Sequence, residues 1–298
     1  MLYIGSRLHE GRESGSVGTT NPSKVGKQEI DFLAEWMRSK QFPPAYQQKL
    51  WGYVRLFLRH HGNPILDTLK ARSLWKSPPN SRPAIRTKDE VWYKDTLQRL
   101  EGVDGWPGSV IRFAVAFYVG TGVRAGELRK ADLRDLDTVA WRFRVIHPKG
   151  ANRYGIVGAE VDIYAETRVH VADFLAARET RLKALDLNPA EVQALIPNEN
   201  GKQYSEGGWR SMRHKQFRRL GIDGDYRILR RTHAQLLIDR LEAKDYREGA
   251  VIEIGAKRLR NTPEVFRQFY AQLRSRRAED AARLAWESAD EKFSTRPD

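Results

Sequence analysis

The sequence predicts a mainly α-helical protein with one small antiparallel β-hairpin, an α+β fold divided into two domains. Apolar residues recur at helical spacing along most of the chain, whereas residues 141–164 contain two stretches of extended, alternating pattern. The proline-rich segment LWKSPPNSRPAIRTKDE interrupts the helical pattern and predicts a linker. A chain of 298 residues has room for both domains, because one domain typically holds about 100–200 residues.

The first domain is predicted to be a small helical domain over residues 27–76. Between Lys27 and His61, apolar side chains fall on one face of each of two helices, which the helix-breaking FPP separates. Residues 1–26 show no continuous apolar run of the signal-peptide kind, so we expect a flexible arm on a cytoplasmic chain. The linker is predicted over residues 77–86.

The second domain is predicted over 87–298 and begins with a capping box, in which Thr87 pairs with Glu90 and opens a helix through Leu100. SVIRFAVAFYVGTG predicts an apolar helix that ends at glycine, and VRAGELRKADLRDLD predicts another. WRFRVIH and RYGIVGAEVDIY predict the two strands, joined by a turn at PKGAN. From Ala165 the pattern is helical to the end, including an amphipathic C-terminal helix.

The charge balance points to a polyanionic partner. Fifty-two Lys and Arg residues against 38 Asp and Glu residues give a net charge of +14, which attracts nucleic acid, although such a surface can also serve solubility alone. No segment reaches the roughly 18 apolar residues of a spanning helix, so we expect no membrane partner. The absence of cysteine, and histidines without chelating spacing, predict neither a metal site nor another cofactor.

Four segments carry candidate chemistry: GTGVRAGELRKADLRDLD, HPKGANRYG, LRRTHAQLLI and LRNTPEVFRQFYA. In this order and spacing they resemble the boxes of the tyrosine recombinase (phage integrase) family. Those boxes are Thr-Gly-x-Arg-x-x-Glu-Leu, a hairpin lysine, His-x-x-Arg with Thr-x-Ala, and Leu-Gly-His nine residues before a nucleophilic tyrosine. The resemblance runs from about Ser81 to Leu273, and the helical first domain fits the family's core-binding domain only loosely.

The resemblance implies a catalytic set of two arginines, a hairpin lysine and a tyrosine, which are here Arg124, Arg230, Lys149 and Tyr270. Glu127 would support the arginines. Two positions depart from the pattern, with Arg227 in place of the first histidine and Asn261 in place of the histidine or tryptophan before the tyrosine. We expect both to act at the phosphate, Arg227 as a third cation and Asn261 as a hydrogen-bond donor.

These residue types suit phosphodiester transesterification. Two guanidiniums stabilise the extra negative charge that develops on the phosphorane oxygens, and a cationic surrounding lowers the cost of ionising a tyrosine whose ordinary pKa is about 10. Lys149 could protonate the leaving 5′ oxygen. A covalent phosphotyrosine conserves the energy of the broken bond, so rejoining needs neither ATP nor a metal.

Several positions have rivals or plainer interpretations. Lys130 or Arg153 could replace Lys149, and Arg231 could replace Arg230. Tyr226 could occupy the place given to Arg227 if the loop is shifted by one, and His233 is either a catalytic helper or a packed core residue. Four cations beside the boxes are predicted to contact DNA: Arg129, Lys130, Arg153 and Arg231.

The leading hypothesis is therefore a site-specific recombinase or integrase that acts as a homotetramer on double-stranded DNA recombination sites, in a cytoplasmic, nucleoid-associated setting. A DNA-binding relative with weak or lost cleavage is the main alternative, because two positions of the pattern are changed. Two other hypotheses are a type IB-like relaxing enzyme and a basic structural protein without a site.

Overall fold

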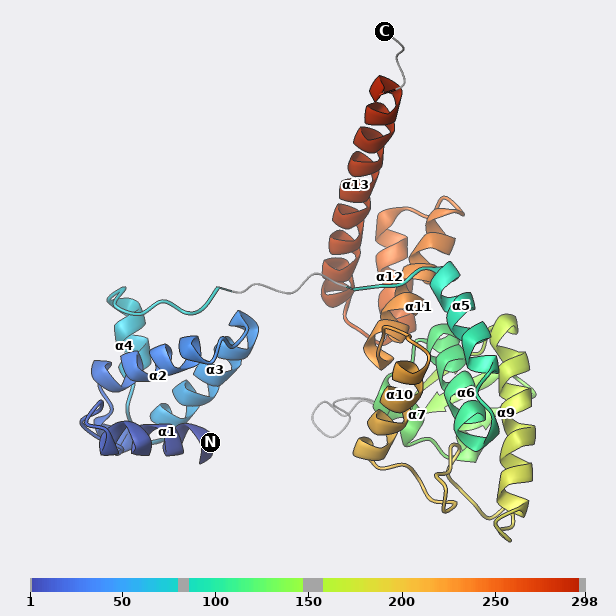
Figure 1. The fold of residues 1–298 in the computed structure, drawn as a ribbon, viewed down its shortest axis with the longest axis horizontal. Coiled ribbons are helices and arrows are strands. Elements are labelled where there is room, and N and C mark those ends of the chain that lie inside the picture. Colours follow the sequence, from blue (N-terminus) through green and yellow to red (C-terminus); the bar gives the residue numbers. More distant parts are fainter. Residues whose placement is uncertain (1, 80–85, 147–157, 295–298) are drawn as a thin grey trace. The chain divides into compact units, whose positions relative to one another are not determined.

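The computed structural model describes residues 2–79, 86–146 and 158–294. The chain forms two compact units, Met1–Ala84 and Ile85–Asp298 (Figure 1). Among the described helices, none combines the length and the apolar composition that crossing a membrane requires.

The first unit is a small helical bundle with its own core. Its helices are α1 (Leu2–Glu13), α2 (Lys27–Ser39), α3 (Pro44–His60) and α4 (Ile65–Ala71), with a 3-10 turn, η1, at Pro22–Lys24. Ile30 and Leu33 of α2 are buried with Trp51 and Leu58 of α3. The two predicted helices are α2 and α3; α4 was not predicted.

The flexible arm expected over residues 1–26 is wrong for most of its length. Ile4 and Leu8 of α1 are buried in the same core as α2, and they are too few to produce a recognisable periodic pattern in the sequence. The loop after α1 is held by the buried carboxylate of Glu29, which accepts hydrogen bonds from the backbone N–H groups of Gly18 (2.9 Å) and Gly26 (2.8 Å).

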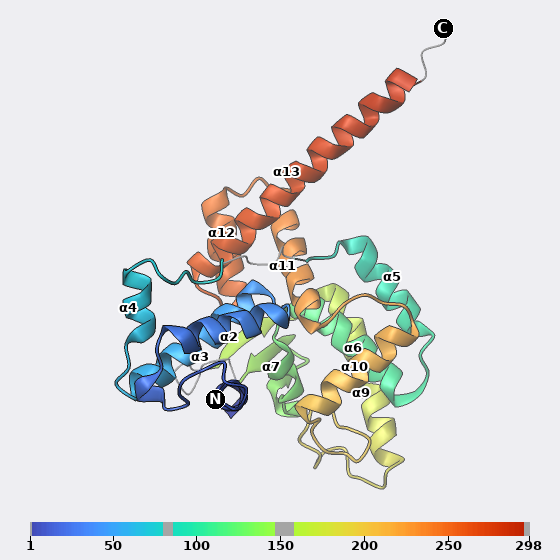
Figure 2. The same ribbon diagram turned by 60° about the vertical axis from the view of Figure 1, so that its left-hand side comes forward.

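The second unit is built around α6 (Gly105–Thr121), a helix that is buried over most of its length. The helices that pack on α6 are α5 (Glu90–Glu101), α9 (Ala165–Lys183), α10 (Glu206–Arg219) and α11 (Tyr226–Glu242). The remaining helices are α7 (Ala125–Arg129), α12 (Glu248–Leu259) and α13 (Pro263–Ser294). α12 packs on α11 and on α13, and the far part of α13 runs beyond both in the two views (Figures 1 and 2).

The predicted capping box at the start of α5 is wrong. Asp89 is the N-cap, and its side chain accepts a hydrogen bond from the backbone N–H of Trp92 at 2.8 Å. Thr87 lies two residues earlier, and its hydroxyl contacts Gln235 of α11 at 3.5 Å. An aspartate two residues after the threonine was an equally good cap, and the tertiary contact of Thr87 decides between them.

The helix predicted over VRAGELRKADLRDLD is also wrong in its length. Only α7 is α-helical there, followed by the 3-10 turn η2 (Leu133–Asp135) and the strand β1 (Leu136–Asp137). Asp135 accepts a hydrogen bond from the N–H of Asp132 at 2.9 Å, and Leu133 N–H donates to the carbonyl of Gln193 at 2.7 Å. These bonds replace helical ones, so tertiary pairing overrides the local helical pattern.

The sheet has three antiparallel strands in the order β1–β2–β3, where β2 is Arg142–Val145 and β3 is Ala159–Asp162. Phe143 pairs with Leu136 and Val161 in register, and all three side chains are buried in the core of the unit. The two strands of the predicted hairpin are confirmed, and β1 was not predicted. The predicted turn, with Lys149, lies outside the described residues.

Candidate active site

The turn between α6 and α7 places Arg124 at the start of α7. Gly122 ends α6 in the left-handed conformation (φ 65°), and an added Cβ there would lie 2.5 Å from a carbon of the buried His233 ring, so only glycine fits. Arg124 follows in extended conformation as the N-cap. The glycine thus both ends one helix and directs the next, as the sequence pattern indicated.

Glu127 holds Arg124 in this position. One carboxylate oxygen accepts the backbone N–H of Arg124 at 2.8 Å, and the other accepts its guanidinium Nη1 at 2.8 Å. The Glu127 side chain is 2% exposed, whereas that of Arg124 is 25% exposed. The pair is therefore no surface salt bridge, because a buried carboxylate fixes a cation that solvent still reaches.

Arg230, in the second turn of α11, is tied to two chain segments at once. It donates hydrogen bonds to the carbonyl of Gly122 through Nη1 and to the carbonyl of Leu259, the last residue of α12, through Nη2. Burial, together with repulsion from Arg124 and Arg260, lowers its pKa to about 9, so the guanidinium remains charged at neutral pH.

Asn261 connects the two arginines. Its Oδ1 accepts hydrogen bonds from Nη2 of Arg124 (3.1 Å) and from Nη2 of Arg230 (3.5 Å). Since both neighbours are pure donors, the amide oxygen faces them and the amide nitrogen faces away. The two arginines, 106 positions apart in the chain, therefore converge on one amide oxygen.

Arg260 is a site residue that the sequence analysis missed. It follows α12 in the left-handed conformation (φ 52°, ψ 47°), its Nη2 donates to Glu127 at 2.7 Å, and its carbonyl accepts from Nη2 of Arg124 at 3.0 Å. The sequence did offer one sign of this role. In the segment Leu259-Arg260-Asn261, an arginine replaces the glycine of the Leu-Gly-His box.

The cluster formed by Arg124, Arg230, Arg260, Glu127 and Asn261 carries an excess of positive charge. Burial by itself would raise the pKa of Glu127, but Arg260 and Arg124 outweigh it, so the pKa lies below its ordinary value and the group is ionised. Three guanidiniums then surround one carboxylate. Such a partly buried cluster is suited to binding an anion such as a phosphodiester.

Tyr270 does not lie in this cluster. It is 3% exposed within a core formed by α11, α12 and α13, and its hydroxyl donates to a carboxylate oxygen of Glu242 at 2.7 Å. Glu242 is the last residue of α11, and its distance of 12 residues from Arg230 corresponds to a rise of about 18 Å. Burial and the Glu242 carboxylate raise the pKa of Tyr270 to about 12.

By sequence, no protein-family model and no curated protein matches this chain. Solved structures match it along most of its length. XerH site-specific recombinase, bound to palindromic difH substrate in a post-cleavage complex, superposes with a TM-score of 0.63 and 14% identity over 94% of this chain and 77% of that one.

Two further structures match in the same way. A lambda integrase dimer bound to a COC′ core site gives a TM-score of 0.57 and 12% identity, over 90% of this chain and 87% of that one. The Tn1549 transposon integrase in complex with transposon right end DNA gives a TM-score of 0.56 and 14% identity, over 94% of this chain and 93% of that one. The fold is that of the tyrosine recombinases.

Within this tyrosine recombinase fold, Arg227 stands in the first turn of α11. Its side chain is exposed and lies one helical turn before Arg230, on the same face. Tyr226, the alternative occupant, is excluded because its ring is buried against Trp209 and its hydroxyl donates to the Trp209 carbonyl at 3.1 Å. Arg231, the rival of Arg230, makes none of the described contacts to Asn261.

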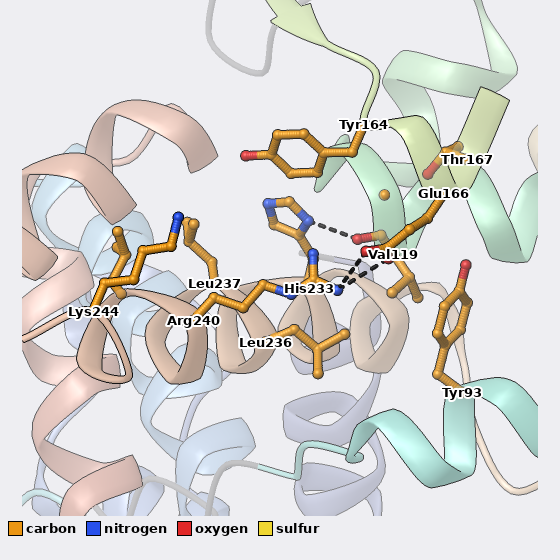
Figure 3. A pocket seen from close by; sticks show the side chains of 12 residues that line it. Tyr93, Val119, Tyr164, Glu166, Thr167, His233, Leu236, Leu237, Arg240 and Lys244 are labelled. Carbon is orange, nitrogen blue, oxygen red and sulfur yellow. Dashed lines mark hydrogen bonds and ion pairs between the residues drawn. The ribbon is translucent and has the colours of Figure 1, made fainter.

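His233 packs in the core of the recombinase fold. Its Nδ1 is 2.7 Å from the carbonyl of Val119, and burial lowers its pKa to about 3, so the ring is neutral. The ring lines a cavity of about 240 Å³ beside Tyr164, which an ion pair between Arg240 and Glu166 also borders (Figure 3). The position favours the packing interpretation over a proton-transferring one.

The basic residues that were predicted to contact DNA fall into three groups. Arg129 is partly buried and donates to the carbonyl of Tyr204 at 2.7 Å, which ties α7 to the loop before α10. Lys130 is exposed and Arg231 is partly exposed, so both have a side chain that solvent reaches. Arg153 lies outside the described residues, as does Lys149, the predicted catalytic lysine.

Proposed function

We propose that this chain is a site-specific DNA recombinase of the tyrosine recombinase family, which cuts and rejoins DNA through a 3′-phosphotyrosine without ATP or a metal. The observation that carries the proposal is the convergence of Arg124 and Arg230 on Asn261, with Glu127 buried behind Arg124. Residues matched to separate boxes by sequence alone thus meet in one cationic cluster, in the fold of known recombinases.

The cluster would bind the scissile phosphate. As the tyrosine oxygen approaches phosphorus, negative charge grows on the non-bridging oxygens, and guanidiniums held by Glu127 and by backbone carbonyls need little reorganisation to stabilise it. Arg227 would add a third cation from the same face of α11, and the amide nitrogen of Asn261 would donate a hydrogen bond.

In the proposed cleavage step, the Tyr270 oxygen forms a bond to phosphorus, the bond from phosphorus to the 5′ oxygen breaks, and Lys149 gives a proton to that oxygen. The phenol gives its own proton to solvent as the new bond forms. Rejoining reverses these transfers with the 5′ hydroxyl of another strand, so each step conserves one phosphodiester bond.

Cleavage requires Tyr270 to leave its position on Glu242. Two contacts hold α13 against the end of α11: the Tyr270 hydroxyl on one Glu242 oxygen, and Arg277 on the other oxygen at 2.6 Å. Arg277 also pairs with Asp239. We infer that DNA binding, or assembly of four copies on two recombination sites, shifts α13 and brings the hydroxyl to the arginines.

A suicide substrate, a nicked duplex whose cut fragment diffuses away, tests the proposal. The wild-type chain is expected to form a covalent adduct whose linked peptide contains Tyr270, and Tyr270→Phe should abolish the adduct while leaving DNA binding unchanged. Tyr246→Phe, at an exposed tyrosine, is the matched control and should retain the adduct. An adduct that persists in Tyr270→Phe would disprove the assignment.

A second candidate is a DNA-binding protein that has this fold but does not cleave. The position of Tyr270 favours it, because a hydroxyl held by a carboxylate, with its pKa raised to about 12, is a poor nucleophile. The same substrate separates the two, since this protein would bind the duplex and leave no covalent product at any protein concentration.

A further inference from the structure

Arg260 is a charged side chain at a backbone position that favours glycine. The residue directly follows α12 with φ 52° and ψ 47°, in the left-handed region, where a side chain other than that of glycine is strained. Its side chain is nevertheless 11% exposed, so the guanidinium points inward rather than to solvent. Five other described non-glycine residues share this backbone conformation, so the buried contacts of the Arg260 side chain, rather than its backbone, carry the argument.

Two contacts of Arg260 lead to Arg124, and its Nη1 also donates to the carbonyl of Arg258 at 3.5 Å. Its Nη2 donates to Oε2 of Glu127 at 2.7 Å, while Oε1 of the same carboxylate accepts Nη1 of Arg124 at 2.8 Å. Its backbone carbonyl accepts Nη2 of Arg124 at 3.0 Å. Arg124 is therefore bound on one side by a carboxylate that Arg260 fixes, and on the other by the carbonyl of Arg260 itself.

We propose that Arg260 is a positioning residue of the reaction: it fixes the carboxylate of Glu127 and so orients the Arg124 guanidinium toward the scissile phosphate. The inference rests on the proposed function. Glu127 has 2% of its side chain exposed and Arg124 has 25%, so Arg260 acts from behind, through a buried carboxylate, on a cation that an incoming strand can reach.

The cation also keeps Glu127 ionised. The charged and titratable groups around this carboxylate are Arg124 from α7, Arg260 after α12, Arg230 from α11 and Tyr118 from α6. Burial opposes ionisation, and the charge of Arg260 is the largest single contribution that favours it, so removing Arg260 raises the pKa of Glu127. As the pH falls through the raised pKa, the carboxylate is neutralised and its hold on Arg124 weakens.

The test compares adduct formation on the suicide substrate between wild type and Arg260→Gly from about pH 5 to pH 9. Glycine suits the backbone, so folding should be retained. The variant should form adduct roughly ten- to a hundredfold more slowly, because misplacing a group in the site has costs of that order. The acidic limb of its rate profile should move to higher pH, and Arg260→Lys should recover part of the rate.

Lys257→Ala is the matched control, since it removes one positive charge from the exposed face of the same helical turn. It should leave both the rate at saturating DNA and the acidic limb unchanged. If wild type forms adduct and Arg260→Gly matches it in rate and pH profile, the inference is wrong. If wild type forms no adduct, the proposed function fails instead.

A readout that needs no activity completes the test. In protein carrying ¹³C-labelled glutamate, the carboxyl carbon of Glu127 should titrate at higher pH in Arg260→Gly than in wild type and Lys257→Ala. Identical titration in all three proteins would overturn the inference, whatever the outcome with DNA.

Discussion

At the scale of single residues, several buried charged groups in this protein hold chain segments rather than forming simple pairs. Glu29 fixes the loop after α1, and Glu127 fixes Arg124. Arg178 of α9 is 3% exposed and donates to the carbonyls of four residues in one loop, Pro189, Val192, Ala194 and Leu195. Each of these groups satisfies backbone atoms that burial would otherwise leave unpaired.

Arg178→Met should therefore destabilise the protein strongly. Methionine fills a similar volume but donates no hydrogen bond, so buried carbonyls lose their partner, and the free energy of unfolding should fall by about 3 kcal/mol. Urea unfolding measures the change. Arg181→Met, on the same helix, removes one exposed carbonyl contact at 3.3 Å and should lower the free energy of unfolding by under about 1 kcal/mol. Equal losses in both variants would contradict the explanation.

At the scale of elements, the contact between α11 and α13 fixes the position of Tyr270, the proposed nucleophile. Tyr270 and Arg277, two turns apart on α13, meet the same carboxylate at the end of α11. The cluster of arginines is held by other segments, namely the α6–α7 turn and the end of α12. The two hydrogen bonds of Arg230 to these segments do not involve α13, so the proposed shift of α13 would leave them in place.

Glu242→Gln should accelerate adduct formation several-fold. The amide lacks the charge that holds Arg277 and raises the pKa of Tyr270, so the hydroxyl leaves its position and ionises more easily. Single-turnover cleavage of the suicide substrate measures the rate. Glu253→Gln, at an exposed glutamate of α12, is the control; equal rates in both variants would contradict this role of Glu242.

At the scale of the whole molecule, the net charge of +14 bears on the proposed binding to DNA. The cations of the arginine cluster are mostly buried, whereas Lys130 and Arg227 are exposed and can contact the backbone of a duplex. Phosphate contacts release counterions, so binding should weaken steeply as salt is added.

Between 50 and 200 mM salt, the affinity for a duplex should fall by about a thousandfold or more, if roughly six or more phosphates are contacted. Lys130→Ala should reduce the slope of log affinity against log salt by about one and leave cleavage at saturating DNA unchanged. Fluorescence anisotropy measures both slopes. Salt-independent binding would show that the positive charge serves another purpose.

The local sequence pattern was sufficient to predict much of the fold. The apolar periodicity that predicted α2, α3 and α6 is strong, and the two strands β2 and β3 alternate clearly, so these elements could be read from the chain. α1 and β1 could not be predicted from the sequence, because each depends on a few residues that become buried only against distant partners. The same holds for Thr87, whose partner lies on α11.

By itself the sequence determined the residue types of the candidate site and their order, since motif spacing assigned Arg124, Glu127, Arg230 and Asn261 to separate boxes whose residues meet in the structure. Only the tertiary structure decided that Arg260 joins them and that the Tyr270 hydroxyl is hydrogen-bonded to Glu242 rather than placed beside the arginines. The physical reason is that hydrogen bonds between remote segments depend on where folded helices end, and linear spacing does not specify this.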